Sequence, residues 1–81
     1  MATTTRYFRK IDKKILGGEF IDIIPYEVGS NQLSIFFNGL LCIPGRDYQY
    51  MEVGKIGERS EKIQIRFTMD EDDEFMAIVI V

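Results

Sequence analysis

The chain has 81 residues, of which 46% are hydrophobic and 12% aromatic, and it contains no His and no Trp. A chain of this length makes one domain that buries only about 60–65% of its unfolded surface, so we expect neighbouring subunits to cover part of its apolar surface. Its formal charge of −3 argues against a protein that holds nucleic acid mainly by charge. Without His the chain lacks the commonest general base and metal ligand, and we expect no enzymatic activity, catalytic residue, cofactor or metal site.

Residues 1–17 form a basic segment that the pattern predicts to be a short helix or an irregular arm. Phe8, Ile11 and Ile15 have the spacing of one helix face, while Thr5 could act as the N-cap and Gly17 could end the helix. The basic and aromatic side chains could contact nucleic acid, but an acidic chain with one short basic stretch favours docking into a protein neighbour. The residues to which we assign this docking are Arg6, Tyr7, Phe8, Arg9 and Lys10.

A strand and a β-hairpin are predicted next. Residues 19–24 have the composition of a strand that Pro25 ends, and a loop then leads into the hairpin. Asn38-Gly39 lies between two apolar runs, which is the strongest local signal for a hairpin with a type I′ turn. Such a turn places Phe37 opposite Leu40.

Two tyrosines follow a second predicted turn. Pro44-Gly45 marks the turn, and in residues 47–51 the side chains of Tyr48 and Tyr50 are expected on one face of a strand. We favour core packing for Tyr48, whereas for Tyr50 core packing and a contact surface for carbohydrate or protein stay equally open. The residues assigned to turns and structural support are Asn38, Gly39, Pro44, Gly45, Asp47 and Tyr48.

Residues 62–67 and 75–81 give the clearest strand patterns. In the first, Ile63, Ile65 and Phe67 alternate with polar residues, which predicts a half-buried strand. The second is apolar at every position, as in a central strand or one whose outer face another subunit covers. Short strands with connections too short for crossover helices predict one all-β domain over residues 18–81, a small antiparallel β-sandwich of six to seven strands.

Five consecutive acidic residues lie between these two strands. They lack the glycine and the ligand spacing of a calcium-binding EF-hand loop, so we expect a solvated turn that discourages edge-to-edge aggregation. The alternative is docking against the basic N-terminal segment of a neighbouring copy. The acidic run consists of Asp70, Glu71, Asp72, Asp73 and Glu74.

The single cysteine, Cys42, cannot form an internal disulfide, and its apolar surroundings predict a buried, unreactive thiol. No apolar stretch approaches the ~20 residues that span a bilayer, and the first residues lack the apolar core of a signal peptide. We therefore expect a protein that is made in the cytoplasm and has no membrane partner.

The order of these segments resembles a known family. The stretch from Gly18 to Gly39, the segment Pro44-Gly45-Arg46-Asp47-Tyr48 and the acidic turn before the last apolar strand are similar to a small β-sandwich module of tailed bacteriophages. This module occurs in tail-fibre and other virion structural proteins. The resemblance covers residues 18–81, whereas residues 1–17 have no counterpart and the connection over residues 53–60 is longer.

The resemblance implies a virion structural protein, a tail-fibre or adaptor component that is made in the host cytoplasm. Its partners would be other copies in a symmetric oligomer and other virion proteins, and the basic segment would anchor it to the particle. A capsid decoration or cement protein is one alternative, and a module that binds a host carbohydrate or protein is another. The apolar residues expected to join subunits are Phe36, Phe75, Ile78 and Ile80.

Overall fold

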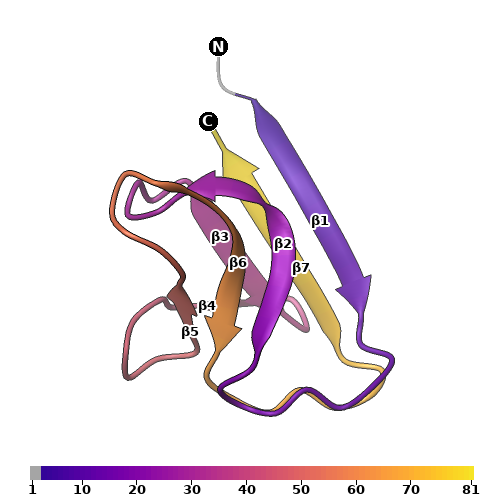
Figure 1. Cartoon of the computed structure of the whole chain (residues 1–81). Coiled ribbons are helices and arrows are strands. Elements are labelled where there is room, and N and C mark those ends of the chain that lie inside the picture. The colour runs from indigo at the N-terminus through magenta and orange to yellow at the C-terminus, as the bar shows by residue number, and fades with distance from the viewer. Residues whose placement is uncertain (1–2) are drawn as a thin grey trace.

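The computed structural model describes residues 3–81, which form seven β-strands and no helix. The strands form a four-stranded sheet in the order β1-β7-β3-β4 and a three-stranded sheet in the order β2-β6-β5, and all pairings within them are antiparallel. The two sheets pack against each other as a small sandwich (Figure 1), which confirms the predicted fold class. The strands are β1 (Thr4–Lys10), β2 (Phe20–Glu27), β3 (Leu33–Phe37), β4 (Leu40–Cys42), β5 (Tyr50–Glu52), β6 (Arg59–Ile65) and β7 (Glu74–Ile80).

The last strand, β7, lies in the middle of the four-stranded sheet, between β1 and β3. Its residues Phe75, Ala77 and Val79 are 1%, 0% and 3% exposed and face the core between the sheets. Met76 and Ile78 alternate with them, point to the other side of the sheet and are half-buried. β7 is therefore a central strand, which is one of the two alternatives that its apolar sequence predicted.

The predicted N-terminal helix is wrong, because residues 4–10 form strand β1 at the edge of the four-stranded sheet. β1 pairs with β7 without a register shift, from Thr4 opposite Ile80 to Lys10 opposite Glu74. After β1 the chain crosses to the second sheet through a connection with a bend and a turn, and the side chains of Ile11 and Ile15 are buried in the core. The spacing of these isoleucines reflects this crossing and not the face of a helix.

In the three-stranded sheet, β2 continues past Pro25, where the sequence suggested that it would end. The pairing of β2 with β6 shifts register between Asp22 and Tyr26, so the proline lies in a bulge that needs no ladder N–H at that point. Beyond the bulge the buried Tyr26 hydroxyl donates to the carbonyl of Lys62 at 2.7 Å and accepts from the N–H of Val53 at 3.1 Å. This side chain of β2 thus bonds to β6 and to the residue that directly follows β5.

The hairpin between β3 and β4 is the one that the sequence predicted. Phe37 pairs with Leu40, and Asn38 and Gly39 have φ values of 48° and 83°. Asn38 also fastens this turn to the acidic turn: its side-chain oxygen accepts from the Glu74 N–H at 2.7 Å, and its Nδ2 donates to Asp73 Oδ1 at 3.2 Å. The local pattern indicated the backbone role of Asn38 but gave no sign of this second one.

The expected packing of Tyr48 is wrong, because β5 begins only at Tyr50 and Tyr48 belongs to the preceding turn. Tyr48 is 56% exposed, whereas Tyr50 is 1% exposed. The Tyr48 ring covers Gly45, where an added Cβ would lie only 2.7 Å from Tyr48 Cδ2. This turn is closed by the Gly45 N–H, which donates to the Tyr50 carbonyl at 2.8 Å, and by a bridge between Pro44 and Tyr50.

Candidate interaction surface

The outer side of the four-stranded sheet carries a continuous row of large apolar side chains. Phe8 pairs with Met76, Met76 with Phe36 and Phe36 with Leu41, so the row runs across β1, β7, β3 and β4 in turn. Phe8 is 61% and Leu41 63% exposed. Phe8, Phe36 and Met76 also border a shallow hollow on this side. We call this surface the outer apolar face, and it consists of Phe8, Phe36, Leu41, Met76, Ile78 and Ile80.

Three of the four residues predicted to join subunits lie on the outer apolar face. Phe36 and Ile78 are half-buried there, and Ile80 is 50% exposed. Phe75 does not belong with them, because it points into the core and is 1% exposed. The sequence could not separate Phe75 from its neighbour, since side chains alternate between faces and both faces of this strand are apolar.

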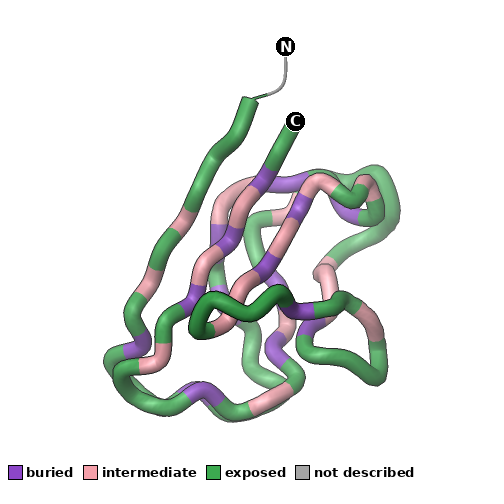
Figure 2. The backbone as a smooth tube through the Cα atoms, turned by 180° about the vertical axis from the view of Figure 1, so that it is seen from behind, coloured by how far each residue is buried: buried purple, intermediate pink, exposed green. Residues whose placement is uncertain are grey.

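The residues predicted to dock the N-terminal segment all lie in β1. Arg6, Phe8 and Lys10 are exposed, whereas Tyr7 and Arg9 are half-buried. No residue of β1 is buried, as the green and pink tube of this strand shows in Figure 2. Within residues 3–81, β7 is the only strand that pairs with β1, so the other edge of β1 faces away from the sheet.

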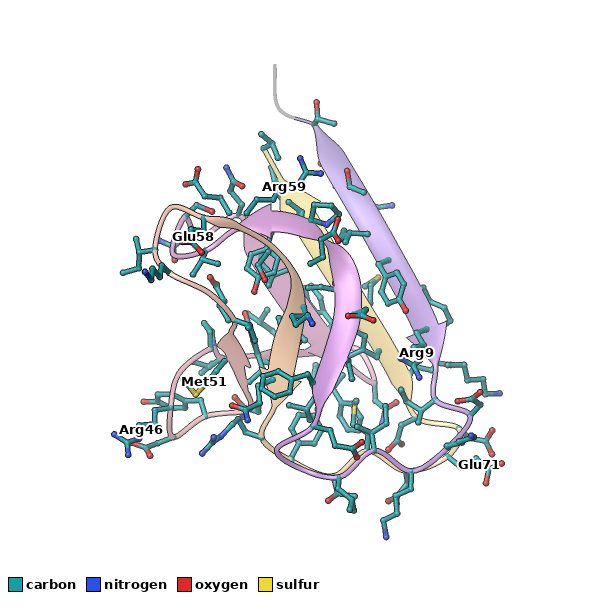
Figure 3. The ribbon with its side chains drawn as sticks, in the orientation of Figure 1. Arg9, Arg46, Met51, Glu58, Arg59 and Glu71 are labelled. Atoms are coloured by element: carbon teal, nitrogen blue, oxygen red, sulfur yellow. The ribbon has the colours of Figure 1, made fainter. Side chains whose placement is uncertain are left out.

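The basic strand and the acidic turn meet at one end of the molecule. The Ile11 N–H donates to the Asp73 carbonyl and the Asp72 N–H donates to the Ile11 carbonyl, both at 2.8 Å. Lys10 Nζ lies 3.8 Å from Asp72 Oδ1, with side chains 62% and 81% exposed. Figure 3 shows Arg9 and Glu71 near this end of β1. Pairs this exposed stabilise a fold by at most about 1 kcal/mol. Because both side chains stay mostly exposed, the charges of Lys10 and Asp72 remain accessible to a neighbouring molecule.

The acidic turn is held by hydrogen bonds within the chain. Asp73 Oδ2 accepts from the Asp70 N–H at 2.8 Å, and Asp72 adopts a φ of 74°. Among the residues that the structure describes, no group of three or more His, Cys, Asp or Glu side chains is placed to hold a metal ion. Through its hydrogen bonds to Ile11 and Asn38, the acidic turn connects the end of β1 and the β3–β4 hairpin to the start of β7.

A polar groove lies between β1 and β2, where the edges of the two sheets separate. It has a volume of about 420 Å³, and its lining includes Tyr7, Arg9, Phe20 and Asp22. Phe20 is 59% exposed on the outer side of β2. Aromatic and charged side chains around an open groove are the kind of surface on which polar ligands bind.

Two residues considered for chemistry or contact are buried. The Tyr50 side chain is almost fully buried, so it offers no contact surface to a ligand. Burial, and to a smaller extent the charge of Glu52, raises the pKa of its phenol. Cys42 is a free thiol, 6% exposed, as its sequence context predicted. Burial raises the pKa of this thiol, which keeps it protonated and unreactive at neutral pH.

No helix that could cross a membrane is found in the part of the chain that the structure describes. Comparisons of this chain with family models, with curated proteins and with solved structures give no match.

Proposed function

We propose that this chain is a non-enzymatic structural module that assembles with copies of itself through the outer apolar face. The observation that carries the proposal is the row of Phe8, Met76, Phe36 and Leu41 through all four strands of one sheet. Each Å² of apolar surface removed from water contributes about 25 cal/mol, so covering such a face favours association. The core cannot accept these side chains, because the other side of the same sheet already fills it.

The charges around this face suit a second copy of the same chain. Arg6 and Lys10 lie on the same side of the sheet as Phe8, and Glu74 pairs with Lys10 on that side. A symmetric interface brings the same patch of both copies together, so it needs both signs of charge within one patch. The part of the outer apolar face along β1 carries both signs of charge, because Arg6 and Lys10 are basic and Glu74 is acidic.

Light scattering of the purified chain tests self-assembly. We expect the wild type to have the mass of more than one copy and Leu41→Lys to have a smaller mass, because a charge then lies in the apolar row. Leu16→Lys is the matched control, since Leu16 is 56% exposed at a position outside this face and Leu41 is 63% exposed. Equal masses for the two variants would contradict the proposal.

We further propose that the assembly is part of a tailed-phage virion, in the tail fibre or its adaptor, where the resemblance in sequence points. An antibody against the chain should then label the tails of particles of the phage whose genome encodes it. Label on the head would instead favour the capsid decoration role. Particles without label would contradict the virion placement and leave self-assembly standing.

Binding of a host carbohydrate or protein is a second candidate function, and the groove between β1 and β2 is the observation that favours it. In such a site Phe20 would stack on the ligand, while Arg9 and Asp22 would supply hydrogen bonds. A glycan array tests this role. Specific binding that is lost in Phe20→Ala would support it, and the absence of any specific glycan would count against a carbohydrate ligand.

A further inference from the structure

We infer that the free edge of β1 pairs with β1 of a second copy, antiparallel and centred on Tyr7, which joins two four-stranded sheets into one of eight strands. This inference rests on the proposed function, because it names the edge by which copies join. It is separate from the outer apolar face, which lies at a right angle to that edge.

The hydrogen bonds of the β1–β7 pair show which backbone groups of β1 are free. Thr3 and Val81 exchange two backbone hydrogen bonds of 2.9 Å, and the Ile11 N–H donates to the Asp73 carbonyl at 2.8 Å. In an antiparallel pair such bonded positions recur at every second residue. The odd-numbered residues of β1 therefore bond to β7, and the N–H and C=O groups of Thr4, Arg6, Phe8 and Lys10 point away from the sheet.

β1 is the one long sheet edge in the described chain with neither a proline nor a break in register. β4 and β5, at the far edges of the two sheets, have only three residues each, and the segment after β4 is bridged to β5 between Pro44 and Tyr50. β2 carries a proline and a register shift. β1 has seven residues, no proline and an unbroken register, so its four free N–H and C=O pairs form a template for another strand.

The charges of β1 select one register for pairing with a second copy. If Arg6 lay opposite Arg6, or Phe8 opposite Phe8 with Arg6 opposite Lys10, like charges would face each other, which destabilises a strand pair. Centring on Tyr7 instead places Arg6 opposite Phe8 and Thr4 opposite Lys10. This register uses all four free positions, contains no pair of like charges directly opposite, and puts each Arg6 guanidinium beside a Phe8 ring.

A cysteine on the symmetry axis tests this register. In the proposed pair Tyr7 lies opposite Tyr7 of the second copy at a non-hydrogen-bonded position, where Cα atoms are about 4.5 Å apart, within disulfide range. Tyr7→Cys should therefore form a covalent dimer under mild oxidation. Thr5→Cys is the matched control, because its two copies would lie four residues apart, about 14 Å. Cys42 is buried in both variants.

Equal cross-linking of the two variants, or none in Tyr7→Cys, would overturn the inference. A second pair of variants covers the case in which Tyr7→Cys does not fold. Arg6→Pro removes an N–H that points away from β7, whereas Arg6→Val keeps it. In sedimentation the assembly of Arg6→Pro should have half the mass of the Arg6→Val assembly. Equal masses would overturn the inference.

The two proposals fail in different ways. If Tyr7→Cys gives no disulfide while the wild type still assembles and Leu41→Lys still reduces its mass, edge pairing is wrong and assembly through the face stands. If the wild type is a monomer at every concentration and no disulfide forms, both are wrong. A disulfide in Tyr7→Cys that persists when Leu41→Lys is added would show that the edge joins copies without help from the face.

Discussion

Replacing Asn38 tests how strongly the β3–β4 hairpin is fastened to the acidic turn. Glycine adopts a φ near the observed 48° without strain, so in the folded state Asn38→Gly removes only the side-chain bonds to Glu74 N–H at 2.7 Å and to Asp73 Oδ1 at 3.2 Å, while the added freedom of glycine in the unfolded chain acts in the same direction. Each hydrogen bond contributes about 0.5–1.5 kcal/mol, and both lie near solvent. We expect Asn38→Gly to lower the free energy of unfolding by about 1–2 kcal/mol.

Asn38→Ala adds a backbone cost to the same loss. A residue with a Cβ in the left-handed region costs about 1–2 kcal/mol, while Asn tolerates it better than Ala. The alanine variant should therefore lose about 2–4 kcal/mol in total. Gly39→Ala isolates the backbone cost, because the φ of Gly39 is 83° and an added Cβ would have no heavy atom within 4 Å.

Urea unfolding at neutral pH measures these differences, and thermal unfolding checks them. For a domain of this size a loss of 1 kcal/mol lowers Tm by about 4–8 °C. The expected order of stability is wild type, then Asn38→Gly, then Asn38→Ala. A glycine variant as stable as the wild type would show that the fastening contributes nothing, and an alanine variant equal to the glycine variant would refute the backbone argument.

Four other results are expected. Tyr26→Phe should lower the free energy of unfolding in urea by about 1–3 kcal/mol, because it leaves a backbone carbonyl and N–H without the hydroxyl; an unchanged midpoint would contradict this role. Ile63→Ala should cost about 2–5 kcal/mol in the same assay, since Ile63 is 0% exposed, whereas Ile56→Ala, at 87% exposed, should cost little; equal losses would contradict the assignment of the core. The contribution of Tyr50 to the free energy of unfolding should be fully present below about pH 10, the ordinary pKa of a tyrosine, and decrease above it, because the folded state keeps the Tyr50 proton that the unfolded chain releases; Tyr50→Phe should flatten this decrease in a urea series over pH. Cys42 should react with a thiol reagent only as fast as the protein opens, and a fast reaction in native buffer would show an accessible thiol.

The strands that the sequence predicted well are those whose signal is local. Asn38-Gly39 between apolar runs determines both the turn and the pairing of Phe37 with Leu40. The alternation through Ile63 and Ile65 likewise depends only on neighbours in the chain, and both residues are fully buried. The apolar residues 75 to 81 predict a central strand or one covered by another subunit, and β7 is central in its sheet.

β1 was missed because its signal is not local. Its inward positions include Arg9, which is half-buried and interrupts the apolar alternation of a strand. Its partner is β7, more than sixty residues away in the sequence. Phe8 and Ile11 then matched the period of a helix by coincidence. β7 has an equally distant partner in β1 but is apolar from residue 75 onward, so the weak local pattern of β1 together with this distance is what hid the strand.

The candidate surface was predicted in part. Phe36, Ile78 and Ile80 share the outer apolar face with Leu41 and Met76, which were not among the predicted interface residues. Leu41 could have been selected, because the predicted hairpin register places it opposite Phe36. Met76 could not, since choosing between the two faces of β7 requires the position of the core.

The central place of β7 has a consequence for synthesis on the ribosome. β1 and β3 both pair with β7, and β3 otherwise pairs only with the three residues of β4. At about 5–20 residues per second, β1 waits several seconds before its partner is made. During that interval the nascent chain can complete the β2-β6-β5 sheet but not the four-stranded one, and β1 stays open to chaperones or to β1 of a chain on a neighbouring ribosome.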